Sequence, residues 1–379
     1  MKVAIVHDWL TTWAGAEKAL AQLIACYPDA EIFTTVNFLK TEDIPCLTGR
    51  TIHTSFIQKL PGARKHYRRY LPLMPLAVEQ FDLKGFDLIL SSSHAVAKGI
   101  IPDPAALHVC YCYSPMRYAW DMQHQYLRQS GNEKGLVGML MRWQLHRLRQ
   151  WDYLSAQRVD HFIAISAYIQ RRVELFYRRS AEIIYPPVDI EKFNAHRQRS
   201  DFYLTAARMV PYKRIDLIIE AFNQMPDKKL VVIGDGPDFA KLNAQAGPNV
   251  KLLGYQPDSV LIDHLERAKA FVYMAEEDFG ILPVEAQAAG APVIGYGKGG
   301  LAETIVHQQT GLLVEAQSST ALKQGVAQLE QQQQPDSQQR MASLCRQNAQ
   351  RFANSEFTQA MQNSIATAYS ALHSAKNRG

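Results

Sequence analysis

The feature of this sequence that most restricts its fold is an alternation of short apolar segments with helical ones. The segment 2–8 (KVAIVHD) predicts a buried strand, and the loop TTWAGAEKAL then leads into a helix near Glu17. Strands of the same kind are predicted at residues 31–36, 51–55, 87–93, 108–113 and 161–166. Because helical segments separate these strands, the simplest arrangement is a parallel sheet in a doubly wound α/β domain.

The length of 379 residues favours two domains of fewer than about 200 residues each. Pro186 and Pro187 interrupt helix formation within residues 183–193, and a second α/β pattern begins beyond them. We therefore expect Rossmann-like domains at residues 1–185 and 186–354. Near the C-terminus, Gln331–Gln334 followed by Pro335 predict an exposed connection between helices.

The cysteines and the apolar segments bear on the cellular compartment. The cysteines are Cys26, Cys46, Cys110, Cys112 and Cys345. Their odd number and the absence of a C-x-x-C pair favour a reducing compartment over a disulfide framework or a zinc site. No signal peptide is recognisable, and no run reaches the roughly 20 apolar residues of a spanning helix. We expect a cytoplasmic protein, and peripheral binding to the inner face of the cytoplasmic membrane stays open.

Positive charge is concentrated in the first half of the chain. Residues 1–199 hold 25 Lys plus Arg against 18 Asp plus Glu, a balance of +7, whereas the remainder holds 16 against 18, a balance of −2. Basic and aromatic residues mix at 63–72 and 141–153, where helical spacing places Trp143, Arg147 and Trp151 roughly on one face. Such segments suit an anionic membrane surface, or they are solvated faces with aromatics turned inward. No nucleic-acid module is recognisable.

The stretch 276–290, EEDFGILPVEAQAAG, predicts a loop followed by a helix with Pro283 at its first position. Glu277 and Glu285 then stand on either side of the helix start. A helix N-terminus offers unpaired amides and partial positive charge, so an anion can bind there. Two flanking carboxylates suit the hydroxyls of a nucleotide sugar. The alternative is a capped helix with two exposed acids.

A second cluster of candidate residues follows the strand that ends near Ala206. Arg208 and Lys213 lie five residues apart on one predicted loop, so both can reach one diphosphate. Fixed cations would stabilise the negative charge that grows on a departing nucleoside diphosphate. The alternative is a pair of surface charges. Gly234 is the first of two glycines that could flank the nucleotide, because it ends the next predicted strand.

These motifs together resemble the retaining glycosyltransferases of family 4. The residues that carry the resemblance are Arg208, Lys213, Gly234, Glu277, Phe279, Gly280 and Glu285. The resemblance implies a GT-B fold, in which two Rossmann-like doubly wound parallel-sheet domains face a cleft. The second domain would bind the donor and the first the acceptor, and a last helix, about residues 355–379, would pack back on the first domain.

The resemblance also implies roles in the second domain. The amides of Gly280, Ile281 and Leu282, with Arg208 and Lys213, would hold the diphosphate. Glu285 would bind the ribose and Glu277 the transferred hexose, while the main chain of Gly254 and Tyr255 would hold the base.

In the first domain, His94 ends a predicted strand, where ligands of α/β sheets bind. From position alone a histidine is more often structural, but the resemblance implies a contact with the donor sugar. Gly15 lies in the first loop and allows close approach to a ligand, although Ala14 stands where the family usually has another glycine. The resemblance implies that no metal, no cofactor beyond the donor substrate and no side-chain base are needed, and the chain has no D-x-D motif.

The segments SSSHAVAKG and CYCYSPMRYAWD resemble mannosyltransferases of bacterial O-antigen, capsule or exopolysaccharide assembly. GDP-mannose is therefore the first candidate donor, with a lipid-linked saccharide as acceptor, and UDP-sugars stay open. In SPMRYAWD the guanidinium and aromatic rings suit a sugar or phosphate, or they pack in the core. A sugar-nucleotide 2-epimerase of the same fold is an alternative. A dinucleotide-dependent oxidoreductase is disfavoured, because the glycine fingerprint G-x-G-x-x-G is missing from the first loop.

Overall fold

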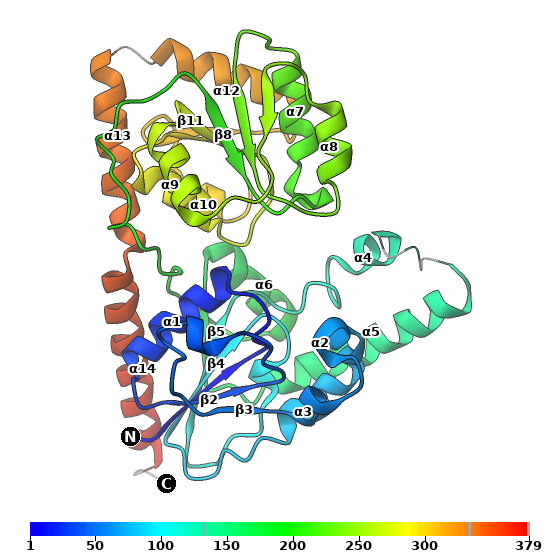
Figure 1. Ribbon diagram of the computed structural model, residues 1–379. Helices are drawn as coiled ribbons and strands as arrows, with labels where there is room; N and C mark the ends of the chain where they lie inside the picture. The colour runs from blue at the N-terminus through cyan, green and yellow to red at the C-terminus, as the bar shows by residue number, and fades with distance from the viewer. Residues whose placement is uncertain (130, 132–133, 333–334, 377–379) are drawn as a thin grey trace. The chain divides into compact units, whose positions relative to one another are not determined.

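The computed structural model describes residues 1–129, 131, 134–332 and 335–376, and the chain forms two compact α/β units (Figure 1). The first unit contains Met1–Tyr185 and the chain from Phe357 onward, and the second contains Pro186–Glu356. Each unit is built on a sheet whose strands are all parallel among the described residues. The predicted class of two parallel-sheet α/β domains is confirmed.

The sheet of the first unit has the strand order β3-β2-β1-β4-β5-β6-β7 in the described part of the chain. Its strands are β1 (Val3–His7), β2 (Glu31–Thr34), β3 (Ile52–Thr54), β4 (Leu88–Ser93), β5 (Leu107–Cys112), β6 (His161–Ala164) and β7 (Glu182–Ile183). Its helices are α1 (Gly15–Cys26), α2 (Ala63–His66), α3 (Met74–Glu79), α4 (Gln123–Gln129), α5 (Gly135–Ala156) and α6 (Ala167–Tyr177), with 3₁₀ turns η1 (Thr41–Asp43), η2 (Phe56–Lys59), η3 (Tyr67–Leu73) and η4 (Ala97–Gly99). Every residue of β1, β4 and β5 is buried, as expected for central parallel strands covered on both faces.

The second unit repeats this plan with the strand order β10-β9-β8-β11-β12-β13 among its described residues. Its strands are β8 (Tyr203–Ala206), β9 (Leu230–Ile233), β10 (Val250–Leu252), β11 (Ala270–Tyr273), β12 (Val293–Tyr296) and β13 (Gly311–Val314). Its helices are α7 (Ile215–Asn223), α8 (Phe239–Gln245), α9 (Asp258–Arg267), α10 (Ile281–Ala288), α11 (Leu301–Thr304), α12 (Ser319–Gln332) and α13 (Pro335–Ala349), with 3₁₀ turns η5 (Pro211–Lys213) and η6 (Gln350–Phe352). The core is apolar, and α7 packs into it with Ile215, Ile218, Ile219 and Phe222.

The strand orders matter for function because each sheet reverses its direction of winding once. In the first unit this happens between β1 and β4, whose register pairs Val3 with Leu88 and His7 with Ser92. In the second unit it happens between β8 and β11. At such a point the loops that follow the two strands diverge, which leaves room for a ligand at the carboxyl edge of the sheet.

The last helix, α14 (Asn354–Lys376), contacts the first unit. The Phe357 ring lies 5.5 Å from the Tyr111 ring, and Ser364 Oγ donates to Glu182 Oε2 at 2.6 Å. Residues 377–379 of the predicted final helix lie outside the described residues. So do residues 333–334 of the predicted glutamine-rich connection, which falls between α12 and α13.

One predicted helix boundary is wrong. Helix α10 begins at Ile281, with Gly280 at its N-cap, so Pro283 is the third helical residue and not the first. The first turn tolerates proline there, because its amides have no intrahelical acceptor and nothing is lost when one N–H is missing. Gly280 has φ of +90°, a left-handed conformation that side chains disfavour, and this turns the chain from the loop into the helix.

Candidate functional site

The switch point of the second sheet brings together three polar side chains. Lys213 lies in η5 after β8, Tyr273 ends β11, and Glu277 lies in the loop that follows. Lys213 Nζ forms an ion pair with Glu277 Oε1 and lies 3.0 Å from the Tyr273 hydroxyl oxygen. The same hydroxyl lies 3.0 Å from Glu277 Oε1. The two sequence candidates therefore meet, and Tyr273, which was not among the candidates, joins them.

This Lys213–Tyr273–Glu277 cluster is largely shielded from water, since the Lys213 and Glu277 side chains are each 14% exposed. Burial by itself would lower the pKa of Lys213, but the Tyr273 oxygen and the Glu277 carboxylate outweigh it and raise that pKa above its usual range. Burial, reinforced by the Glu277 carboxylate, raises the pKa of Tyr273. Lys213 is therefore a fixed cation and Tyr273 a neutral hydroxyl at physiological pH.

Arg208 provides a second positive charge on the same loop, and it is more exposed to solvent than Lys213. It lies between β8 and η5, and its side chain is exposed. Within the described ranges, no carboxylate forms an ion pair with it. The positive charge of Lys213 is thus already balanced by the Glu277 carboxylate, whereas the charge of Arg208 is available to an anion.

The start of α10 supplies the amides that the sequence predicted. The loop from Glu277 to Gly280 is held by the turn after β12, where the Gly300 amide donates to the Glu277 carbonyl at 2.8 Å. In the part of the chain that the structure describes, no acceptor pairs with the amides of Gly280, Ile281 and Leu282. These amides lie at a helix start, where an anion can bind, and Gly280 is three positions beyond Glu277 of the cluster.

Glu285 lies inside α10 and is only 4% exposed. Its Oε1 lies 3.1 Å from Lys192 Nζ, a contact between residues 93 positions apart. The alternative of two exposed acids at this helix is therefore wrong. Lys192 was not a sequence candidate, because nothing in the segment 183–193 indicates which carboxylate its ammonium group faces.

The candidates for the base site follow β10. The Gly254 carbonyl accepts a hydrogen bond of 2.9 Å from the Gly234 amide, which ties the ends of β9 and β10 together. Tyr255 is 78% exposed and presents its ring to solvent. Strands lie about 4.8 Å apart, so β10 is roughly 10 Å from β8 across β9. That separation suits a nucleotide whose phosphates lie at β8 and whose base lies at β10.

The switch point of the first unit holds His94 and Asp8, which follow β4 and β1. His94 Nδ1 lies 2.9 Å from Asp8 Oδ2, and the His94 ring meets the Trp9 ring edge-on at 4.6 Å. Asp8 also accepts hydrogen bonds from the backbone amides of residues 94 to 97. Asp8 was missed, although it ends its strand as His94 does, and the same argument from strand ends would have found it.

His94 and Asp8 shift each other's pKa. Burial opposes the charged form of both, but the His94 interaction holds the pKa of Asp8 well below its usual range. Burial would likewise lower the pKa of His94, and the Asp8 carboxylate raises it instead. His94 is therefore biased towards the imidazolium form and can present a positive charge or a proton donor, since its side chain keeps 30% exposure.

Gly15 is the first residue of α1, the helix that follows β1 in the chain. The Ala14 amide donates to Glu17 Oε2 at 2.9 Å, and Glu17 Oε1 lies 3.7 Å from His7 Nε2. Ala14, which replaces the expected glycine, is thus the N-cap of α1 and its amide is already paired. The end of the loop before α1 is held by Glu17 through the Ala14 amide, and Gly15 follows as the first helical residue.

The SPMRYAWD loop, another sequence candidate for ligand contact, is held by contacts within the first unit. Trp120 Nε1 donates to Asp152 Oδ2 at 2.7 Å, and its ring stacks on Phe176 with centroids 4.8 Å apart. Asp121 pairs with Arg172 at 2.5 Å. For Trp120 core packing is therefore the better interpretation, whereas the Asp121 side chain is 38% exposed and forms an ion pair at the surface.

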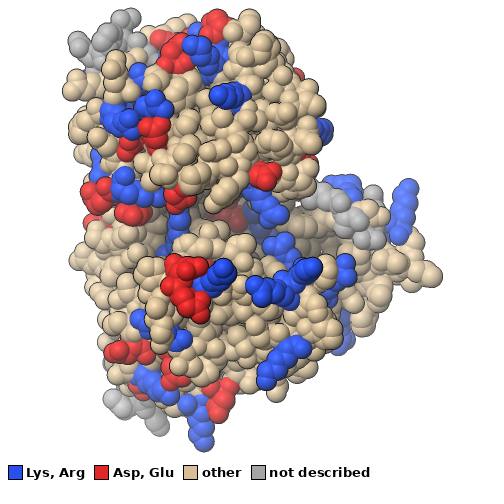
Figure 2. Space-filling model, in the orientation of Figure 1, with Lys and Arg blue, Asp and Glu red and all other residues tan. Residues whose placement is uncertain are grey.

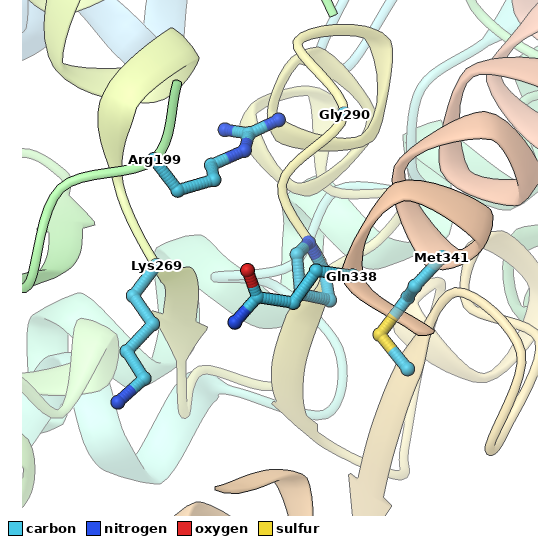
Figure 3. A pocket seen from close by; sticks show the side chains of 6 residues that line it. Arg199, Lys269, Gly290, Gln338 and Met341 are labelled. Carbon is cyan, nitrogen blue, oxygen red and sulfur yellow. The ribbon is translucent and has the colours of Figure 1, made fainter. Parts of the chain in front are cut away.

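Two cavities in the second unit lie away from these candidate residues. One, of about 20 Å³, is lined by Arg199, Lys269, Gly290, Pro292, Gln338 and Met341 (Figure 3). Arg199 there donates to the carbonyls of residues 265, 268 and 289, so its charge serves the backbone. The other, of about 700 Å³, is lined mainly by residues before or at the first positions of β8, β9 and β10, with His264 of α9. Both lie at the amino ends of strands, the edge opposite the candidate site.

Among the residues that the structure describes, no three His, Cys, Asp or Glu side chains are grouped as ligands for a metal ion. No helix in the described ranges combines the length and the apolar composition needed to cross a membrane.

Sequence comparison links the second unit to a known family. Residues 189–351 match the family described as glycosyl transferases group 1. The chain is 28% identical over 175 residues to an uncharacterized glycosyltransferase of Methanocaldococcus jannaschii, covering 45% of this chain and 49% of the relative. It is 31% identical over 188 residues to a GDP-mannose-dependent monoacylated alpha-(1-6)-phosphatidylinositol monomannoside mannosyltransferase of Corynebacterium glutamicum, covering 41% and 49%. The chain thus spans about half the length of these curated relatives.

Structural comparison covers nearly the whole chain. The crystal structure of Anabaena Alr3699/HepE in complex with UDP matches with a TM-score of 0.72 at 18% identity. The match covers 97% of this chain and 100% of that chain. At this identity the likeness shows the fold alone, and it confirms the predicted GT-B class.

Proposed function

We propose that this chain, whose residues 189–351 belong to the glycosyl transferases of group 1, is a retaining glycosyltransferase that uses a nucleoside diphosphate sugar. One observation carries the proposal. Arg208, the Lys213–Tyr273–Glu277 cluster and the free amides at the start of α10 all lie where β8 and β11 end. Two cations and a helix end at one switch point suit a diphosphate leaving group.

The proposed chemistry begins at the diphosphate. As the bond between the anomeric carbon and the phosphate oxygen breaks, negative charge grows on the phosphate. Lys213 meets this charge as a cation already oriented by Glu277 and Tyr273, and exposed Arg208 adds the second. The amides of Gly280, Ile281 and Leu282 complete the phosphate site. Preorganised groups of this kind need no reorientation when the transition state forms.

Glu277 is the candidate for binding the transferred hexose. Lys213 and Tyr273 both bond to its Oε1. Its Oε2 has no hydrogen-bond partner in the described ranges, so it can accept from sugar hydroxyls. Glu285, beside Lys192, is the candidate for the ribose hydroxyls. The main chain at Gly254 and Tyr255 would hold the base.

The acceptor hydroxyl is proposed to attack from the face that the diphosphate leaves, and a phosphate oxygen of the donor takes its proton. No side-chain base is then required. The two glutamates are not a hydrolase pair, because Glu277 is engaged by Lys213 and Glu285 by Lys192, so neither is arranged to deliver a proton across a glycosidic bond. His94 is the residue of the first unit proposed to contact the sugar.

The first candidate donor is GDP-mannose, and the first candidate acceptor is a lipid-linked saccharide of bacterial surface polysaccharide synthesis. A curated relative is named for GDP-mannose-dependent transfer, which supports this donor. Structural neighbours solved with UDP and with UDP-glucose keep a UDP-sugar donor as the second candidate. A 2-epimerase of the same fold would act on the donor without any acceptor.

Thermal unfolding in the presence of GDP, UDP, ADP and their sugars tests the donor. A ligand that binds the folded state at 100 times its Kd stabilises it by about 2.7 kcal/mol. We expect GDP and GDP-mannose to raise the midpoint most. The reaction is then followed with donor alone and with donor plus a lipid-linked saccharide. Turnover that needs no acceptor would support the epimerase, and failure of every nucleotide to bind would refute the proposed site.

Arg208 offers a matched pair of variants. Arg208→Ala should reduce transfer at least about 100-fold without loss of stability, because its exposed side chain has only the ligand to pair with. Lys241→Ala removes an exposed cation from α8 in the same unit and should leave transfer unchanged. Equal activity of the two variants would contradict the role of Arg208.

A further inference from the structure

Helix α5 exposes an unusual number of apolar side chains. Leu136 is 81% exposed and Trp143 is 58% exposed. The exposed apolar and aromatic residues of this helix are Leu136, Val137, Met139, Leu140, Trp143, Tyr153 and Leu154. Figure 1 shows α5 extending away from the sheet of its own unit. Scattered apolar residues on a surface are ordinary, but a row of them on one helix indicates a binding surface.

These side chains are arranged as a stripe. Leu136, Leu140, Trp143 and Arg147 follow one another at intervals of four, three and four residues, which places them on one side of a helix. The opposite side carries Leu148, Asp152, Ser155 and Ala156, all buried. We call the exposed side, with Met139 and Leu154 included, the outer face of α5.

The structure separates the two tryptophans that the sequence placed on one face. Trp151 Nε1 donates to Glu79 Oε1 at 2.9 Å, and its ring packs against Gly99 in the core of the first unit. Trp143 points outward, where the Arg147 guanidinium lies 5.9 Å from the centre of its ring. The helix thus has one tryptophan that anchors it to the unit and another that is available to a partner.

The only acid of α5 is buried, so the exposed charge of this helix is positive. Of its arginines, Arg147 lies on the stripe, whereas Arg149 donates to the Ala119 carbonyl oxygen at 2.6 Å. Its single acid, Asp152, is buried in an ion pair with Lys98. Exposed Arg64, Lys65, Arg68 and Arg69 lie in and after α2 of the same unit. In Figure 2 Lys and Arg side chains stand out on the projecting part of this unit. The outer face therefore carries apolar side chains with the Arg147 guanidinium beside Trp143, and no acid of α5, described along its whole length, is exposed on it.

We propose that the outer face of α5 binds an anionic membrane surface. In this arrangement Leu136, Leu140 and Trp143 enter the headgroup region, and Arg147 pairs with lipid phosphates. A second copy of the chain is a poorer partner, because a symmetric contact would bury Arg147 of both copies while α5, as described from Gly135 to Ala156, has no exposed acid to pair with either. The inference goes beyond the proposed function, since membrane binding requires no turnover.

Co-sedimentation with vesicles tests the proposal. We expect the full chain to bind vesicles of phosphatidylglycerol and phosphatidylcholine in equal parts, and to bind pure phosphatidylcholine much less. Trp143→Glu should lower the partition coefficient at least about tenfold, because it removes a large apolar group and adds a negative charge. Arg147→Ala should lower it about fivefold, the value of one basic residue at such a surface.

The control is Leu175→Glu on α6, since Leu175 is 46% exposed in the same unit but lies on another helix. It should bind vesicles as the parent does. Thermal unfolding and donor binding of each variant show that the fold is kept. The proposal is overturned if the parent binds no vesicles, if Trp143→Glu binds as well as Leu175→Glu, or if light scattering shows a dimer that Trp143→Glu separates into monomers.

Discussion

The ion pair between Lys213 and Glu277 gives the sharpest test, because it should serve stability and catalysis at once. If Lys213 is replaced by methionine, Glu277 keeps a carboxylate that is 14% exposed and has lost its counter-ion. Removing one partner of a buried pair costs about 3–5 kcal/mol. Since this pair keeps some contact with water, we expect the lower end, about 3 kcal/mol.

For a unit of this size, 3 kcal/mol corresponds to a fall in the unfolding midpoint of about 6–12 °C. The double variant Lys213→Met/Glu277→Gln has no unpaired charge, so its midpoint should return to within a few degrees of the parent. Transfer should behave differently. Both variants should lose at least about 1000-fold in turnover, because neither has the cation that stabilises the departing phosphate.

The assay combines calorimetry of the four proteins of this double-mutant cycle with turnover at saturating donor. Glu277→Gln completes the cycle. The reasoning is refuted if Lys213→Met unfolds at the parent's temperature, since the pair would then contribute nothing to stability. It is also refuted if the double variant recovers both stability and turnover, because Lys213 would then have only a structural role.

Three other perturbations test separate parts of the structure. Because the pKa of His94 is raised in the folded state, protonation of His94 stabilises that state below the ordinary histidine pKa of about 6.5. This stabilisation is lost as the pH rises from about 6.5 through the raised pKa. Urea unfolding over a pH series should show the loss of stability, and His94→Gln should abolish this pH dependence. Curves of equal slope for the two proteins would contradict it. Tyr273→Phe should cost about 1–2 kcal/mol in stability and lower kcat more than it raises KM, because the hydroxyl orients both neighbours; an unchanged kcat would count against that role. Gly234→Ala should lower the midpoint strongly, because the new Cβ would stand 2.0 Å from the Ala207 carbonyl oxygen. Gly49→Ala is the matched control, because Gly49 also has a positive φ but open space around an added Cβ. It should lower the stability by only about 1–2 kcal/mol.

The sequence alone was sufficient for the local features of the fold. Apolar runs such as Val3–His7 report burial on both faces of a strand, and this property depends on a few consecutive residues. Helix starts are less certain, as Pro283 shows, because several positions of a first turn accept proline. The five-residue spacing of Arg208 and Lys213 likewise placed both cations on one loop without any tertiary information.

Which strand ends meet was decided only by the tertiary structure. The order of strands places β8 beside β11, and this brings Lys213 to Tyr273 and Glu277, which are 60 and 64 positions away. The packing of α5 on the first unit also separates Trp143 from Trp151, because one ring faces outward and the other lies against the core. Periodicity records whether a side chain is buried, but the identity of its partner depends on packing between distant segments, which no local pattern contains.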